Sequence, residues 1–235
     1  MSGLPKRVLV TGGGTGIGLA VVNRLIELGA EVVAVGRRLE VLEAAQVLGA
    51  SIRSHDVRLD AASLFEAIGP VDGLVLNAGV QRRESIEDWS ETAWREIFET
   101  NLFGAARLIQ AFVAQLDGPG SLVGIASTLA VRPAPQTGAY AASKAGLIAL
   151  LQNVALEGAA SGLRANVVLP GIVETSMIAS DDPELMRSFN RLHPLGRIGQ
   201  PREVAQVVVD VLRNPWMTGA QIPVDGGLLL GAAEV

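Results

Sequence analysis

A serine, a tyrosine and a lysine are spaced along this chain in a way that suits proton transfer. Ser127 precedes Tyr140 by 13 positions, and Lys144 follows Tyr140 by four. Residues four apart on a helix project from the same face, so the phenol and the ammonium group can reach one ligand. A free phenol has a pKa of about 10, and a nearby positive charge lowers that pKa by stabilising the phenolate. These side chains predict a site where Ser127 orients an oxygen atom and Tyr140 moves a proton to or from it.

A glycine-rich turn near the N-terminus predicts a second kind of site, one for phosphate groups. The sequence TGGGTGIG at 11–18 follows a β-branched run and precedes an apolar stripe of helical period. The first turn of a helix presents unpaired N–H groups and the positive end of the helix dipole, which favour a diphosphate. Glycine lets the backbone approach that ligand and adopt positive φ. A diphosphate cradle together with a proton-transfer group predicts nicotinamide-dependent interconversion of a carbonyl and an alcohol.

Short β-branched runs alternate with longer segments of helical period, which is typical of a parallel sheet covered by helices on both faces. The predicted fold is a single-domain, doubly wound Rossmann α/β fold over 1–235. A mobile lid is expected at 179–192, where Asp182 can cap a short helix. The predicted strands are 7–11, 31–35, 51–55, 71–76, 121–126, 164–169 and 220–224, and the predicted helices are 17–28, 39–48, 60–68, 90–116, 138–160 and 201–213.

The composition restricts the protein class and the chemistry. Hydrophobic residues make up 49% of the 235 residues and the formal net charge is -5, which argues against disorder and against an extended nucleic-acid surface. Without cysteine, no disulfide or thiolate site can form. The two histidines, His55 and His193, lack companion ligands, so no metal site is predicted. No apolar stretch reaches the length of a membrane span, and a cytoplasmic location is expected.

Several motifs occur in the order found in the short-chain dehydrogenase/reductase family, which the chain resembles over nearly its whole length. They are the turn at 11–18, Asn-Ala-Gly at 77–79, Asn101, Ser127, the Tyr-x-x-x-Lys of Tyr140 and Lys144, the Pro-Gly loop at 170–175 and the ending at 224–227. The resemblance implies that Tyr140 is the general acid/base and that Lys144 binds the nicotinamide ribose. It also implies that Asn101 supports a water relay that replaces the proton. Related enoyl reductases space their tyrosine and lysine more widely, which makes reduction of a carbon–carbon double bond less favoured.

The resemblance also implies a set of cofactor-binding residues. Gly36 stands where NAD-preferring relatives carry an acid, and Arg37 follows it, so NADP(H) is the predicted cofactor and NAD(H) the alternative. Thr15, however, stands where many NADP-using relatives have a basic residue. The full set is Gly12, Gly14, Thr15, Gly16, Ile17, Gly18, Arg37, Arg38, Asp56, Val57, Asn77, Ala78, Gly79, Tyr140, Lys144, Pro170, Gly171, Val173 and Thr175.

The substrate is the least specified part of this interpretation. By analogy, Leu129, Gln136 and Met177 are expected to form a mostly apolar substrate pocket. Arg82, Arg83 and Arg132 could bind an anionic substrate, although solvated loop charge is the favoured interpretation of them. The alternatives are an NAD-dependent alcohol dehydrogenase, a 3-oxoacyl carrier reductase, and, in another class, a non-catalytic dinucleotide-binding sensor or scaffold. The helices at 90–116 and 138–160 resemble those through which the family forms homotetramers and dimers, and a homotetramer is expected.

Overall fold

The computed structural model describes residues 3–178 and 182–231, and within them seven parallel strands form one sheet of order β3-β2-β1-β4-β5-β6-β7. β2 and β3 extend the sheet on one side of β1, and the chain then crosses to the other side of β1 to form β4 to β7, as in doubly wound folds. The strands are β1 (Arg7–Thr11), β2 (Glu31–Gly36), β3 (Ser51–Ser54), β4 (Gly73–Leu76), β5 (Gly120–Ile125), β6 (Leu163–Pro170) and β7 (Gln221–Val224). This arrangement confirms the predicted fold class.

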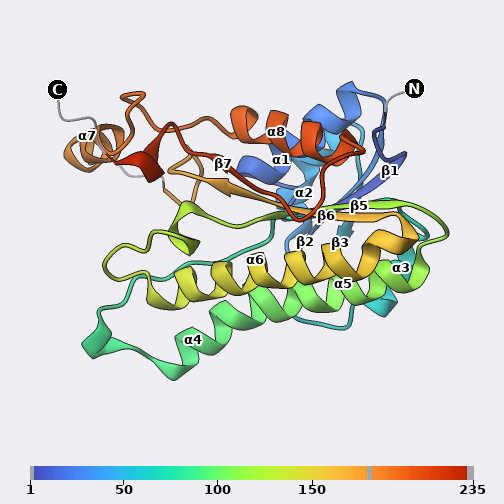
Figure 1. Cartoon of the computed structure of the whole chain (residues 1–235), viewed down its shortest axis with the longest axis horizontal. Helices are drawn as coiled ribbons and strands as arrows, with labels where there is room; N and C mark the ends of the chain where they lie inside the picture. The colour runs from blue at the N-terminus through green and yellow to red at the C-terminus, as the bar shows by residue number, and fades with distance from the viewer. Residues whose placement is uncertain (1–2, 179–181, 232–235) are drawn as a thin grey trace.

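Helices cover both faces of the sheet, because the central strands are apolar on both sides. The helices are α1 (Gly16–Glu27), α2 (Leu39–Val47), α3 (Ala62–Ile68), α4 (Glu91–Phe98), α5 (Gly104–Gln115), α6 (Gly138–Gly158), α7 (Pro183–Arg191) and α8 (Pro201–Arg213). One hydrophobic cluster joins the sheet to α3, α5 and α6, and another joins it to α1, α2 and α8. Figure 1 shows α5 and α6 on one side of the sheet and α1 and α8 on the other.

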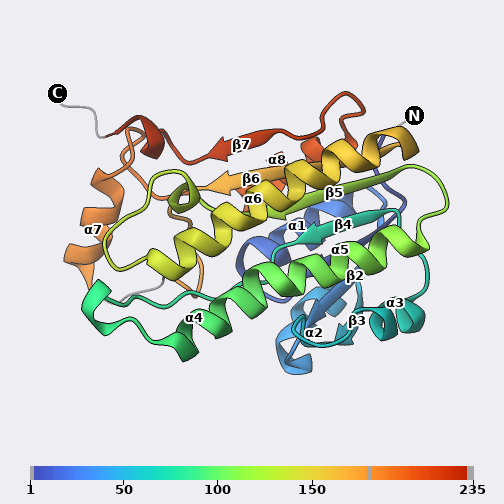
Figure 2. The same cartoon turned by 60° about the horizontal axis from the view of Figure 1, so that its bottom comes forward.

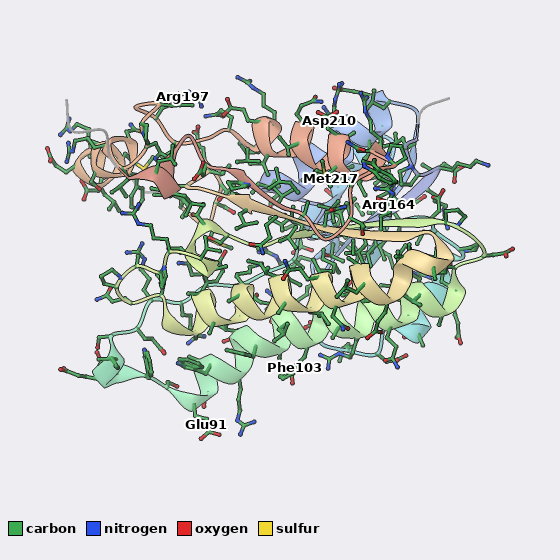
Figure 3. All side chains as sticks on the ribbon, viewed as in Figure 1. Glu91, Phe103, Arg164, Arg197, Asp210 and Met217 are labelled. Carbon is green, nitrogen blue, oxygen red and sulfur yellow. The ribbon has the colours of Figure 1, made fainter. Side chains whose placement is uncertain are left out.

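Side chains of β6 hold the C-terminal end of α8 against the sheet. The Arg164 guanidinium donates to the carbonyl of Leu212 at 2.7 Å and to that of Met217 at 3.3 Å. Arg164 and Met217 lie at the same end of the molecule in Figure 3. Because the last carbonyls of a helix have no partner within it, this arginine fixes the chain that returns to β7.

The parallel strands place their carboxyl ends at one edge of the molecule. In Figure 2 the arrowheads of β4, β6 and β7 point toward the end where α7 lies. The loops that carry the predicted catalytic and cofactor residues follow these strands, so they meet at that edge, as ligand sites of open α/β sheets do.

The predicted helix at 90–116 is interrupted. α4 and α5 are separated by a turn of π-helix at Glu99–Phe103, which contains Asn101. The Asn101 side chain is drawn toward the backbone of Val80 on the neighbouring loop, with which it forms hydrogen bonds. A single turn of π-helix, which holds more residues than an α-helical turn, accommodates that contact, and such turns are frequent at functional sites. The other predicted elements agree with the structure to within a few residues.

Helix α7 occupies most of the predicted lid. Asp182 accepts from the N–H of Glu184 at 2.9 Å and Pro183 begins the helix, as the sequence predicts. Residues 179–181 of the predicted lid lie outside the described residues. Movement of α7 as a lid stays a prediction.

Candidate active site

The turn after β1 forms a cradle of the shape a diphosphate needs. Gly12 and Gly16 have φ of +64° and +52°, which favours glycine at both positions. Thr15 is the N-cap residue of α1, but its side chain forms no capping hydrogen bond, so the first N–H groups of the helix stay available to a ligand. These N–H groups and the helix dipole suit an anionic group at this point.

Gly18 serves the cradle by packing rather than by contact with a ligand. A Cβ atom on Gly18 would lie 2.1 Å from the carbonyl oxygen of Gly12 and 2.5 Å from the Nδ2 atom of Asn77. Asn77 itself donates to the carbonyls of Thr11 and Gly12 at 3.0 and 3.2 Å. Gly18 therefore lets α1 start close against the turn, and Asn77 ties the turn to β4.

Substitution of Gly18 is expected to distort the cradle. We expect Gly18→Ala to lower the free energy of unfolding by about 1–3 kcal/mol through overpacking and to weaken dinucleotide binding at least tenfold. Gly36→Ala is the matched control for stability, because a Cβ there would lie 3.4 Å from Leu42 Cδ2, an ordinary contact. Thermal denaturation and fluorescence titration with the reduced dinucleotide measure both effects. Dinucleotide affinity in Gly18→Ala equal to that of the parent would contradict the assigned packing.

Ser127, Tyr140 and Lys144 meet at the carboxyl end of β5. Ser127 follows that strand, and α6 places Tyr140 and Lys144 on one face. The Ser127 Oγ atom accepts from the N–H of Leu129 at 3.1 Å, and the Ser127 hydroxyl also acts on the Tyr140 phenol. The Lys144 Nζ atom donates to the carbonyl of Ile125 at 2.8 Å and lies 5.8 Å from the centre of the Tyr140 ring. The spacing in sequence thus becomes a cluster in space.

Burial sets the ionisation of this cluster. It raises the pKa of Tyr140 to about 12, an effect that the hydrogen bond with Ser127 opposes. Burial also lowers the pKa of Lys144 to about 8. In both groups the loss of solvent disfavours the charged form, which is the phenolate of Tyr140 and the ammonium of Lys144. At neutral pH the protein alone therefore holds a protonated phenol, ready to donate, beside a lysine that carries its charge.

Asn101 links the π-turn to the loop after β4. Its Oδ1 atom accepts from the N–H of Val80 at 2.8 Å, and its Nδ2 atom donates to the Val80 carbonyl at 2.9 Å and to the Ser143 Oγ atom at 3.0 Å. Both the oxygen and the nitrogen of the buried Asn101 amide are thus hydrogen-bonded, and Asn101 holds the backbone next to Gly79 in place. A Cβ on Gly79 would lie 3.3 Å from Asn101 Oδ1 and 3.4 Å from Lys144 Nζ, which shows how close the groups are.

The glycine turn and the Ser-Tyr-Lys cluster open into one cleft of about 590 Å³. Most of the predicted site residues line it: Gly12, Thr15, Gly16, Ile17, Asn77, Ala78, Gly79, Ser127, Leu129, Tyr140, Lys144, Pro170, Gly171, Val173, Thr175 and Met177. The lining does not include Gly14, Gly18, Arg37, Arg38, Asp56, Val57, Asn101 or Gln136. A cleft of this size, with a phosphate cradle at one end and a phenol at the other, fits a dinucleotide and a small substrate.

The residues predicted to bind the adenosine half lie beyond this cleft. Arg37 and Arg38 are exposed after β2 and form no ion pair within the described part of the chain. Asp56 forms an ion pair with Arg58 at 2.6 Å, and hydrogen bonds from Arg58 hold the pKa of Asp56 below its usual value. Val57 is buried. The family resemblance implies that the Asp56 carboxylate accepts from the amino group of adenine. That contact stays a prediction, and it requires the carboxylate to bind adenine while paired with Arg58 or to release Arg58.

The predicted substrate residues are only partly brought together. Leu129 and Met177 line the cleft, whereas Gln136 is exposed at φ +65° and its carbonyl accepts from the N–H of Glu84 at 3.1 Å. Two further lining residues, Phe189 and Leu192, belong to the segment predicted as a lid at 179–192, whereas the sequence interpretation missed Leu228 and Leu229 of the C-terminal segment. The apolar character of Leu228 and Leu229 was visible, but no local motif indicates that the C-terminal segment folds over the cleft. Among the described residues, no group of three or more His, Asp or Glu side chains could hold a metal ion.

Comparison with known proteins places this geometry in a family. Residues 12–229 match a family model described as enoyl-(acyl carrier protein) reductase. The chain is 34% identical to a 3-oxoacyl-[acyl-carrier-protein] reductase of Chlamydia pneumoniae, with 95% of this chain and 96% of that protein covered. The chain belongs to the short-chain dehydrogenase/reductase family. The predicted family is thereby confirmed.

Other relatives of this dehydrogenase/reductase agree in reaction class. An NADP-dependent (R)-specific alcohol dehydrogenase of Lentilactobacillus kefiri is 33% identical, with 94% of this chain and 96% of that protein covered. The ligand-free aldohexose dehydrogenase of Thermoplasma acidophilum superposes with a TM-score of 0.89 at 28% identity, with 99% and 97% of the two chains covered. This dehydrogenase/reductase is accordingly an NAD(P)-dependent oxidoreductase that acts on CH–OH and C=O groups of a small molecule. None of its helices in the described residues is both long and apolar enough to cross a membrane.

Proposed function

We propose that the protein is an NADP(H)-dependent ketone reductase in which Tyr140 is the general acid/base. The observation that carries the proposal is the convergence of Ser127, Tyr140 and Lys144 on the cleft that begins at the glycine turn. Ser127 and Tyr140 are both about 8% exposed, so each can reach a ligand while most of its surface is shielded from water. Shielding strengthens hydrogen bonds to a developing charge on the substrate oxygen.

Four residues have separate roles in the proposed proton transfer. Ser127 donates a hydrogen bond to the substrate carbonyl oxygen and fixes its position beside the phenol. Tyr140 donates its proton to that oxygen during reduction, and takes it back from the alcohol during oxidation. Lys144 holds the nicotinamide ribose and stabilises the phenolate that is left after donation. Asn101 supports the relay that reprotonates Tyr140 by fixing the loop at Val80 against α6.

The bound dinucleotide supplies the hydride in reduction or accepts it in oxidation, and its oxidised ring adds a positive charge that favours the phenolate. The glycine turn and α1 would hold its diphosphate. The Asn77–Gly79 segment and the loop from Pro170 to Thr175 would flank its nicotinamide half. A Cβ at Gly16 would lie 3.0 Å from Thr175 Cγ2, so the cradle and this loop already approach each other closely.

Preference for NADP(H) rests on the end of β2. Arg37 is exposed and carries a guanidinium that can pair with a 2′-phosphate, while Gly36 offers no carboxylate to repel it. The Lentilactobacillus kefiri relative is an NADP-dependent alcohol dehydrogenase, which is consistent with this preference. Comparison of kcat/KM for NADPH and NADH with a panel of ketones, β-diketones, sugars and an acetoacetyl thioester tests the function. A clear preference for NADH would overturn the cofactor assignment, and preferred use of the thioester would favour a 3-oxoacyl reductase.

Gly36→Asp is expected to reverse the cofactor preference. The new carboxylate would repel a 2′-phosphate and accept from the ribose hydroxyls, so kcat/KM with NADPH should fall about tenfold to a hundredfold while that with NADH is retained or rises. A Cβ at Gly36 meets only an ordinary contact with Leu42, so the fold should tolerate the change. Gly36→Asn is the neutral control. Equal losses with both cofactors would point instead to a general disturbance of β2.

Assembly as a homotetramer and a cytoplasmic location are parts of the same proposal. Exposed apolar side chains lie on α5 and α6 and on the π-turn before α5, among them Phe103, Val113 and Leu156. Figure 3 shows Phe103 directed away from the sheet on the outer side of the helix layer. Exposed apolar side chains on these two helices suit a protein–protein contact, and α5 and α6 of one subunit would pack against the same helices of a second copy. Sedimentation analysis measures the state directly, and a monomer at micromolar concentration would reject the assembly.

A further inference from the structure

The cleft carries an excess of positive charge, and two of its three charged side chains have no part in the proposed proton transfer. The charged side chains that line it in the described residues are Arg83, Arg132 and Lys144, with no carboxylate among them. Lys144 is buried at the base of the cleft beside Tyr140. The two arginines are exposed and belong to loops after β4 and β5. Unpaired like charges in one concave site concentrate anions there.

Hydrogen bonds place the two arginines on the same rim. The N–H of Glu84 donates to the carbonyl of Gln136 at 3.1 Å. This hydrogen bond joins the loop that carries Arg83 to the loop that carries Arg132. The Arg132 Nη1 atom donates to the carbonyl of Leu228 at 2.9 Å, beyond the end of β7. β7 forms one edge of the sheet, and β4, β5 and β6 separate it from β1 and the glycine turn. This rim therefore lies on the substrate side of the cleft, away from the diphosphate cradle.

Both guanidinium groups keep donors available for a ligand. Arg82 is neutralised by Glu96 at 2.9 Å, whereas neighbouring Arg83 forms no ion pair or hydrogen bond within the described part of the chain. Arg132 has five N–H donors, and the hydrogen bond to Leu228 uses one of them while it restrains the side chain. An arginine binds a carboxylate or a phosphate through two parallel hydrogen bonds.

We propose that the substrate is an oxo compound with an anionic group, a carboxylate or a phosphate, which Arg83 and Arg132 bind while its carbonyl oxygen lies at Ser127 and Tyr140. This inference rests on the proposed function, because it assumes that the oxygen is placed by those two residues. An anion held at the rim orients the substrate and raises its local concentration at the reacting end. The site selects oxo acids over neutral ketones of the same size.

Matched pairs of substrates test the charge. The purified protein is assayed with 3-, 4- and 5-oxo carboxylates against their methyl esters, and with acetoacetyl-CoA against the neutral N-acetylcysteamine thioester. We expect at least one anionic compound to exceed its neutral partner in kcat/KM by tenfold or more, since hydrogen bonds to charged groups are the stronger ones. Preference for the carboxylates identifies an oxo acid, and preference confined to the CoA thioester identifies a phosphate-bearing substrate. Equal use of the neutral partners would overturn the proposal.

Variants assign the preference to residues. Arg83→Ala and Arg132→Ala should each reduce the preference for the anionic substrate about tenfold without changing the KM for the dinucleotide. Arg82→Ala is the control and should leave that preference intact, because Arg82 is paired with Glu96. A raised dinucleotide KM with an unchanged preference would overturn the proposal by assigning the arginines to the cofactor. Calorimetric binding of the same pairs to the dinucleotide-loaded protein separates the two proposals. Preferential binding of the anions without turnover would reject the proposed reductase activity alone, and turnover without such preference would reject the anion site alone.

Discussion

Tyr140→Phe should reduce turnover by about 10²–10⁴-fold and leave dinucleotide affinity within about twofold of the parent. The substitution removes one hydroxyl from a side chain that is 8% exposed and keeps the ring that packs beside Lys144. The proton donor is lost, but the cradle at the glycine turn is untouched. The hydroxyl of Ser127 cannot replace the phenol, because its unperturbed acidity is far lower.

The measurement compares single-turnover oxidation of the reduced dinucleotide, followed at the nicotinamide absorbance, with the dissociation constant from fluorescence titration. Ser127→Ala is an informative companion, because it should slow the same step without removing the acid. Unchanged turnover in Tyr140→Phe would show that another group moves the proton. Retained dinucleotide binding with no activity in the parent would instead support a sensor or scaffold on the same fold.

Lys144→Met should cause the second large loss, with kcat/KM for ketone reduction reduced by about 10²-fold or more. Removal of the charge leaves the phenolate without stabilisation and the nicotinamide ribose without a donor, so both turnover and dinucleotide affinity should fall. The same change removes a lysine whose pKa burial lowers to about 8 from 10.5. Below pH about 8 the buried Lys144 is charged, and burial of that charge lowers the free energy of unfolding of the parent. The variant, which buries no charge, should therefore be at least as stable as the parent in that range.

The pH dependence supplies a second readout for Lys144. Its charged form predominates below pH about 8, so kcat/KM for reduction should be level in that range and decline as the pH rises through about 8. The decline should be absent from the residual activity of Lys144→Met. A lower melting temperature in that variant would assign the lost activity to folding, and a profile in the parent that rises with pH would contradict the protonated phenol as donor.

The sequence predicts those parts of the protein that local patterns determine. Apolar runs and turns place the sheet, and the four-residue spacing of Tyr140 and Lys144 survives as one helical face because α6 spans Gly138–Gly158. The glycine turn could likewise be predicted, since Gly12 and Gly16 adopt the positive φ that the motif indicates. For Gly14 the motif alone is less informative, because a Cβ there would lie 2.5 Å from the carbonyl of Val41, a packing constraint from α2.

Features that depend on distant partners could not be predicted. The π-turn carries Asn101, whose amide forms hydrogen bonds with Val80, 21 residues away, a contact that no helical period reveals. The different surroundings of Arg82 and Arg83 depend on Glu96 in α4, although the two arginines are adjacent in sequence. Gln136 was assigned to the pocket by analogy, yet its left-handed backbone places the residue at the surface.

The most direct measurement uses the fact that Tyr140 is the only tyrosine of the chain. Ultraviolet difference absorption of the phenolate therefore reports one group, in the protein alone and in its complex with oxidised NADP. The protein alone should show no phenolate up to pH about 10, since burial raises the pKa of Tyr140 to about 12. In the complex the phenolate should appear below pH about 8, and in Lys144→Met it should not. A complex that shows no phenolate up to pH about 10, or one that titrates identically without Lys144, would contradict the assignment of Tyr140 as the tuned acid/base.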